Sequence, residues 1–90
     1  MNILQTPTFK KQLKKLHKNQ KIDLNKAITT IAKNPAIGET KKGDLSGIQV
    51  YKFKMAKQLT LLAYEFHTNE LKIILLMFGT HENFYRNLKK

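Results

Sequence analysis

The stretch QLTLLAYEFHTNELKIILLMF, residues 58–78, contains two apolar runs joined by a short polar segment. Both runs are apolar on the two sides of a period-2 pattern, which is typical of inner strands that are covered on both faces. The joining segment His67–Glu70 has the composition of a hairpin turn. The stretch therefore predicts an antiparallel pair of strands over residues 58–66 and 71–78.

A third strand is predicted just before this pair, over residues 48–55. Its side chains alternate, so one face carries Tyr51 and Phe53 while the other carries Lys52 and Lys54. Residues 2–5 are long enough for a short edge strand. These segments together predict a twisted antiparallel sheet of three to four strands.

Two helices are predicted ahead of the sheet. Thr6 and Pro7 favour the start of the first helix, because Thr caps well and Pro lacks only an N–H that the first turn does not use. Its apolar stripe, at helical spacing, is Phe9, Leu13 and Leu16. The second helix is expected over about 21–33, with a buried face made of Ile22, Ala27, Ile28 and Ile31.

The second helix is expected to end at Asn34, since the residue before Pro35 is disfavoured in helical conformation. A loop without apolar periodicity follows over residues 36–47, and residues 81–86 suit a short C-terminal turn or helix. This order predicts an α+β fold in which an N-terminal helical hairpin packs on one face of the sheet. The other face is expected to be concave and basic. Ninety residues allow a single domain, 1–90.

Charge is the strongest compositional signal. Seventeen Lys and Arg residues against six acidic ones leave a net charge of +11, and all the basic residues except Arg86 are Lys. Such an excess favours a polyanion or a strongly acidic protein as the partner. Ten of the lysines and only two acids lie in residues 8–42, so the helical hairpin is expected to be Lys-rich.

Several classes of protein are disfavoured by what the sequence lacks. It has no Cys, which excludes disulfides and thiolate metal sites, and its three His and six carboxylates are too scattered to predict a metal site. No phosphate-binding glycine loop is present, so no nucleotide cofactor is expected. The first residues do not resemble a signal peptide, and the longest apolar run, Ile73–Phe78, is too short to cross a bilayer. We therefore expect a cytoplasmic protein with no cofactor and no membrane partner.

One set of residues has the chemistry to cleave RNA without a metal. Lys52 and Lys54 lie about 6.5–7 Å apart on one strand face, and His81, Tyr85 and Arg86 follow the last strand. If the last strand neighbours strand 48–55, these groups converge at one end of the sheet. Cationic groups can then stabilise the phosphate charge, and an imidazole can transfer protons near neutral pH.

Each of these residues also has a plainer interpretation. The two lysines can form a solvated strand face, and His81 can be a loop or capping residue. Phe84 and Tyr85 can stack on a base or fill the core.

Three segments in this order resemble the RelE/ParE superfamily of toxins from bacterial type II toxin–antitoxin pairs. They are Tyr51–Lys54 (YKFK), Leu62–Tyr64 (LAY) and Gly79–Arg86 (GTHENFYR), set after a Lys-rich helical hairpin that ends at Asn34-Pro35. The resemblance covers essentially the whole chain and implies the microbial-RNase-like fold of the RelE branch. It also implies a toxin that cleaves mRNA in the ribosome and is neutralised by an acidic, partly disordered antitoxin.

The resemblance assigns roles to individual residues. In the RelE-like pattern two functional lysines fall on Lys52 and Lys54, a basic residue after the last strand falls on His81, and a base-stacking aromatic falls on Phe84 or Tyr85. The Gly-Thr-His ending resembles YafQ-like toxins, in which that His is an acid–base catalyst. Arg86 is expected at the phosphate. Lys10 and Lys14, on the first helix, are expected to bind the RNA substrate or ribosomal RNA.

The sequence also departs from the pattern. A strand arginine of RelE aligns with Leu61, and neither His67 nor His17 matches the further histidines of YafQ-like sites. ParE-like members share the fold, lack the nuclease residues and inhibit DNA gyrase. A gyrase inhibitor and a plain RNA-binding module therefore remain alternatives to the mRNA endonuclease.

Overall fold

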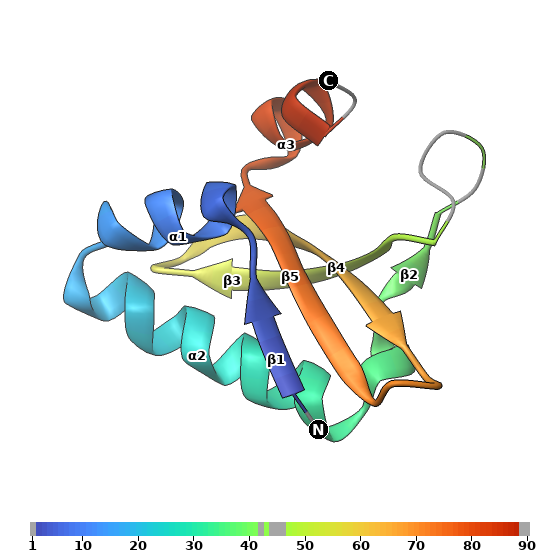
Figure 1. The fold of residues 1–90 in the computed structure, drawn as a ribbon. Helices are drawn as coiled ribbons and strands as arrows, with labels where there is room; N and C mark the ends of the chain where they lie inside the picture. Colours follow the sequence, from blue (N-terminus) through green and yellow to red (C-terminus); the bar gives the residue numbers. More distant parts are fainter. Residues whose placement is uncertain (1, 42, 44–46, 89–90) are drawn as a thin grey trace.

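The computed structural model describes residues 2–41, 43 and 47–88. It has the predicted α+β fold, with three α-helices and a five-stranded sheet (Figure 1). In chain order the elements are β1 (Asn2–Gln5), α1 (Pro7–Lys14), α2 (Lys18–Lys33), the 3-10 helix η1 (Pro35–Ile37), β2 (Glu39–Thr40), β3 (Gln49–Met55), β4 (Gln58–His67), β5 (Lys72–Gly79) and α3 (His81–Leu88).

The strands lie side by side in the order β1-β5-β4-β3-β2, so β4 is at the centre. The predicted antiparallel pairing of residues 58–66 with 71–78 is confirmed, with a register irregularity between Ala63 and Tyr64. The prediction of an antiparallel sheet of three to four strands was wrong in two respects. The observed sheet has five strands, and its strand β1 pairs with β5 in parallel. Neither feature has a local signal, since β2 is two residues long and the direction of β1 depends on pairing with a strand about 70 residues away.

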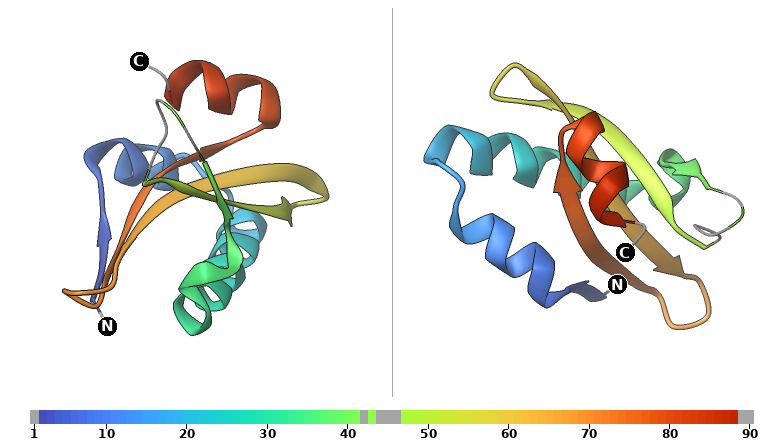
Figure 2. Two further views of the ribbon diagram at one scale, coloured as in Figure 1. Left: turned by 90° about the vertical axis from the view of Figure 1, so that its right-hand side faces the viewer. Right: turned by 90° about the horizontal axis from the view of Figure 1, so that it is seen from above.

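Two apolar cores lie on opposite faces of the sheet. The larger core lies between the sheet and helices α1 and α2, and it includes Phe9, Leu24, Ile31, Leu62 and Tyr64. The smaller core lies beneath α3 and consists of Val50, Leu61, Ala63, Met77 and Phe84. Figure 2 shows α3 on one side of the sheet and α2 on the other. The second face, which was expected to be concave and basic, is thus covered in part by α3.

Helix α2 differs from the prediction in its start and in its buried face. It begins at Lys18, and it buries Leu24, Ala27 and Ile31. Ile22 is 48% exposed, so its assignment to the core was wrong. A residue two positions before Leu24 lies on nearly the opposite side of a helix, so the two side chains cannot both face the sheet. Within the segment 36–47, where only a loop was expected, the chain contains part of η1 and strand β2.

Side chains of α1 and its N-cap complete the outer edge of β5 where β1 has ended. The Thr6 hydroxyl donates to the Leu76 carbonyl at 2.6 Å. The Gln12 side chain bonds both backbone groups of Phe78: its Nε2 donates to the carbonyl at 2.6 Å, and its Oε1 accepts from the N–H at 3.0 Å. The end of β5, which leads into α3, is therefore held against α1.

Candidate functional site at one end of the sheet

Lys52 and Lys54 are exposed on the face of β3 that carries Val50 and the smaller core. The opposite face of β3 carries Tyr51 and Phe53, whose rings stack with centroids 6.0 Å apart and pack on the larger core. The packing of these rings decides which face the lysines occupy. Because α3 lies on the second face, both ammonium groups project from the side of the sheet that α3 covers in part.

Helix α3 is attached to this face through Phe84, which is fully buried on residues of β3, β4 and β5. The Phe84 N–H donates to the Thr80 carbonyl at 2.8 Å, which forms the first turn. His81, at the first position of the helix, and Arg86 are both exposed. The helix therefore presents an imidazole at its start and a guanidinium one to two turns later.

The lysines and the start of α3 lie on opposite sides of β4. Strand β5 does not neighbour β3, so the adjacency on which the predicted convergence depended is absent. Instead, Lys52 pairs with Leu61, and Leu61 pairs with Gly79, so these three residues form one row across the sheet. Two strand spacings, about 10 Å, separate the backbones of Lys52 and Gly79. His81 is two residues beyond Gly79, so α3 begins close to the β5 end of this row.

Four further residues that were predicted to act on the RNA are not shown beside Lys52, Lys54 and His81. Phe84 is fully buried, so no ring face is available to a base and its assignment to base stacking is corrected to a core role. The side chain of Tyr85 lies outside the described residues. Lys10 and Lys14 are exposed on α1, whose Phe9 packs in the core on the other face of the sheet. They belong to a basic surface separate from Lys52 and Lys54.

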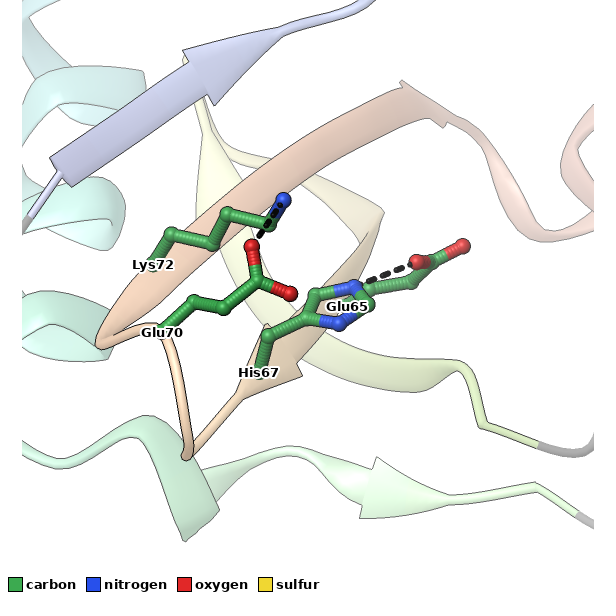
Figure 3. Close-up of polar contacts among 4 residues, drawn as sticks. All are labelled: Glu65, His67, Glu70 and Lys72. Atoms are coloured by element: carbon green, nitrogen blue, oxygen red, sulfur yellow. Dashed lines mark hydrogen bonds and ion pairs between the residues drawn. The ribbon is translucent and has the colours of Figure 1, made fainter.

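The other histidines lie elsewhere, as the sequence suggested. His67 ends β4 beside the β4–β5 hairpin, at the far end of β5 from α3, and its Nε2 is 2.9 Å from Glu65 Oε1 (Figure 3). Beside it, Glu70 pairs with Lys72 at 2.8 Å. The hydrogen bond and charge of Lys72, with a smaller effect of His67, lower the pKa of the Glu70 carboxyl. His17 precedes α2.

Across the described ranges, no group of three or more His, Asp or Glu side chains is placed to hold a metal ion. None of the helices within those ranges has the length and apolar character needed to span a membrane.

A pocket of about 390 Å³ opens at the same end of the sheet, on the opposite face from Lys52 and Lys54. It lies where the connection from α1 to α2 passes the β3–β4 turn and the end of β5. Its lining comes from Gln12, Lys15, Gln20, Met55, Gln58, Thr60 and residues 78–80. The sequence provided no signal for this pocket, because its residues come from segments far apart in the chain and follow no common spacing.

Comparison of the chain with models of protein families gives one match. The family model described as ParE-like toxin of type II bacterial toxin–antitoxin system matches residues 3–89. The chain belongs to the ParE-like toxins. It is therefore a toxin of the RelE/ParE superfamily, which confirms the resemblance seen in the sequence. A search of curated proteins finds none that matches this ParE-like toxin significantly.

Solved structures of RelE are similar to this ParE-like toxin in fold. The toxin in the intact E. coli RelBE toxin–antitoxin complex superposes with a TM-score of 0.70 at 18% identity, over 88% of this chain and 94% of that one. The isolated E. coli RelE toxin superposes with a TM-score of 0.69 at 18% identity, over 98% and 95%. A conserved hypothetical protein from Helicobacter pylori has a TM-score of 0.67 at 25% identity, over 93% and 98%.

Proposed function

We propose that this toxin is a metal-independent endoribonuclease that cuts mRNA on the ribosome, in the bacterial cytoplasm, and so stops translation. The observation that supports the proposal is that Lys52 and Lys54 are exposed on one sheet face and that Lys52 lies in one row with Gly79, two residues before the exposed His81. These residue types match the needs of RNA cleavage through the 2′-hydroxyl. The reaction needs a proton acceptor, a proton donor and positive charge near the phosphate.

Each residue has a role in this proposal. Lys52 and Lys54 stabilise the charge that develops on the phosphate, and His81 moves a proton at the 2′-oxygen or the leaving 5′-oxygen. Arg86 contacts a neighbouring phosphate, and Tyr85 stacks on a base. Position 61 holds a fully buried leucine, so the charge that an arginine supplies there in RelE falls to the two lysines.

Affinity for the ribosome would come largely from the basic helix α1. Lys10 and Lys14 are exposed on α1 and separate from the lysines of β3. We assign them to ribosomal RNA rather than to the phosphate that is cut. Contacts of this kind release counterions from the nucleic acid, so binding weakens steeply as salt rises.

The partner that silences the toxin is proposed to be an acidic antitoxin. The family is one of two-component toxin–antitoxin systems, and E. coli RelE has been solved in complex with its antitoxin. A net charge of +11 would steer an acidic protein toward this chain.

Inhibition of DNA gyrase is a second candidate. Two observations favour it: the matched family is the ParE-like one, and Leu61 replaces a strand arginine of the RelE nuclease pattern. In this case the protein would act by binding alone, and Lys52, Lys54 and His81 would have no catalytic role.

Induced expression of the toxin, followed by mapping of mRNA 5′ ends and of DNA breaks in the same cells, separates the two candidates. We expect new 5′ ends within translated mRNA, no double-strand breaks and no DNA-damage response. The double variant Lys26→Ala, Lys33→Ala on α2 is a matched control for loss of charge and should cut like the parent. Growth arrest with broken DNA and intact mRNA would contradict the nuclease and support gyrase as the target.

A further inference from the structure

The pocket at the sheet end has side chains that match the edge of a nucleobase. An amide side chain carries both a hydrogen-bond donor and an acceptor, and the Watson–Crick edge of each nucleobase also carries both. Gln58 is exposed at the start of β4 and lines the pocket. Gln20 uses its Oε1 to accept from the His17 N–H at 2.8 Å, which leaves its amide hydrogens to donate.

The rest of the pocket is partly apolar, and several of its side chains are held by hydrogen bonds or by core packing. Gln12 is held by its two bonds to the Phe78 backbone, so it forms a fixed wall. Phe78 and Met55 belong to the larger core and provide apolar surface. The buried Thr60 hydroxyl donates a hydrogen bond to the Gln58 carbonyl at 3.0 Å. A pocket of about 390 Å³ is within the size range of small-molecule sites, so it can hold a base without reshaping the core.

The charge at the rim suits a nucleotide. Lys15, the exposed C-cap residue of α1, lines the pocket. None of the described residues that line it is acidic. A base held by the amides can therefore have its phosphate near the Lys15 ammonium.

The pocket and the group formed by Lys52, Lys54 and His81 share one segment of backbone. Residues Gly79 and Thr80 line the pocket, and His81 follows directly at the start of α3. On β3, Met55 lines the pocket while its neighbour Lys54 is exposed on the other face. An extended single strand of RNA that passes around this end of the sheet would meet first one and then the other, the pocket and the group of Lys52, Lys54 and His81.

We propose that this pocket is a nucleotide subsite, which holds a base of the same single-stranded RNA whose phosphate lies at Lys52, Lys54 and His81. This inference rests on the proposed function for the identity of the RNA. Its consequence is that the base bound in the pocket contributes to the choice of cleavage position. Gln20 and Gln58 act as reading groups, and Lys15 acts as a phosphate contact.

The test uses the full chain, labelled with ¹⁵N and titrated by NMR with each of the four nucleoside monophosphates, and with inorganic phosphate as a separate probe. We expect nucleotides, but not phosphate alone, to shift the backbone signals of Thr60, Gly79 and Thr80 and the side-chain amide signal of Gln58. Gln58→Ala and Lys15→Ala should each weaken nucleotide binding about three- to tenfold, the usual effect of one lost hydrogen bond or charge contact. The matched controls, Gln5→Ala on β1 and Lys26→Ala on α2, are exposed and should bind as the parent does.

Shifts confined to Lys52 and Lys54, shifts reproduced by inorganic phosphate, or unchanged binding by Gln58→Ala would each overturn the inference. So would pocket signals that respond to an antitoxin peptide and not to nucleotides, since the occupant would then be a protein side chain. The mapping of mRNA ends judges the proposed function independently. A toxin that cuts mRNA but leaves the pocket signals unmoved refutes the subsite alone, whereas nucleotide binding without any cut mRNA refutes the nuclease and retains the subsite as a nucleotide site.

Discussion

The Tyr64 hydroxyl lies 2.9 Å from the Gly38 N–H, from which it accepts a hydrogen bond, and it donates to the Pro35 carbonyl at 2.7 Å. Tyr64 is fully buried on the central strand β4. A Cβ on Gly38 would lie 2.6 Å from the same hydroxyl, so a residue with a side chain cannot fit without displacing the ring. This contact fixes η1, and with it the chain that leads into β2, to the middle of the sheet.

Tyr64→Phe should lower the free energy of unfolding by about 2 kcal/mol, because it leaves the buried Gly38 N–H without its acceptor. Thermal and urea unfolding measure the change. Tyr51→Phe, on the half-buried face of β3, is the matched control and should stay within about 0.5 kcal/mol of the parent. Equal stability of the Tyr64 variant and the parent would show that the hydroxyl contributes nothing net.

The parent and the Tyr64→Phe variant should respond differently to alkaline pH. Burial raises the pKa of the Tyr64 phenol, and the Gly38 N–H, which stabilises the phenolate, only partly offsets this. The pKa of this phenol is therefore higher in the folded than in the unfolded state. The stability that the protonated phenol contributes to the parent is complete below the ordinary pKa of 10.0, and it is lost as the pH rises from there through the folded-state pKa. The stability gap to Tyr64→Phe should therefore narrow above pH 10. A gap that stays constant would contradict the shift.

Gln12→Ala should destabilise the end of β5 rather than the whole sheet. The Gln12 amide bonds both backbone groups of Phe78, and its loss should cost about 1–2 kcal/mol. Hydrogen exchange measures the effect locally: the Phe78 amide should exchange faster, while amides in the middle of β4 change little. Gln5→Ala serves as the control. Unchanged exchange at Phe78 would mean that water replaces the side chain without cost.

Lys52→Ala combined with Lys54→Ala should reduce mRNA cleavage about 10²–10³-fold, the typical effect of losing preorganised charge stabilisation. Both side chains are exposed, so the melting temperature should hardly change. Cleavage of translated mRNA in a reconstituted translation system is the readout, with Lys26→Ala, Lys33→Ala as the charge-matched control. Full activity in a folded double variant would assign the two lysines to a solvated strand face.

His81→Ala should reduce cleavage about 10²–10⁴-fold if the imidazole transfers a proton. His81→Gln retains hydrogen bonding but cannot titrate, so it should be almost as inactive. His67→Gln, at the far end of β5, is the control and should cut normally. Single-turnover cleavage at saturating toxin separates chemistry from ribosome binding, which both His81 variants should retain. A fully active glutamine variant would exclude acid–base catalysis at this position.

Binding of the antitoxin should weaken as salt rises. The net charge of +11 attracts an acidic partner over a range that salt shortens, from about 10 Å at 0.1 M to about 3 Å at 1 M. Calorimetry at several salt concentrations, with the co-encoded acidic protein as ligand, measures this. An affinity that does not depend on salt would show that apolar contacts, rather than charge, carry the binding.

Much of the local structure was determined by the sequence alone. The period-2 pattern of residues 48–55 correctly placed Lys52 and Lys54 together on one face, and Thr6-Pro7 and Asn34-Pro35 marked the start of α1 and the end of α2. These features depend on backbone dihedrals and side-chain alternation, which act between residues close in the chain. The same local signals, with the ordered motifs of β3, β4 and α3, were enough to indicate the toxin family.

Only the tertiary structure decided how the elements combine. The parallel placement of β1, the position of β4 between Lys52 and Gly79, and the burial of Phe84 all depend on contacts between residues far apart in sequence. The sequence left Phe84 open between base stacking and the core, because an aromatic residue in an amphipathic helix serves either role. The packing of α3 on the second face assigns Phe84 to the core, because its ring is buried against apolar side chains of β3, β4 and β5. The pocket beside His81 likewise exists only because three separate regions of the chain close around one end of the sheet.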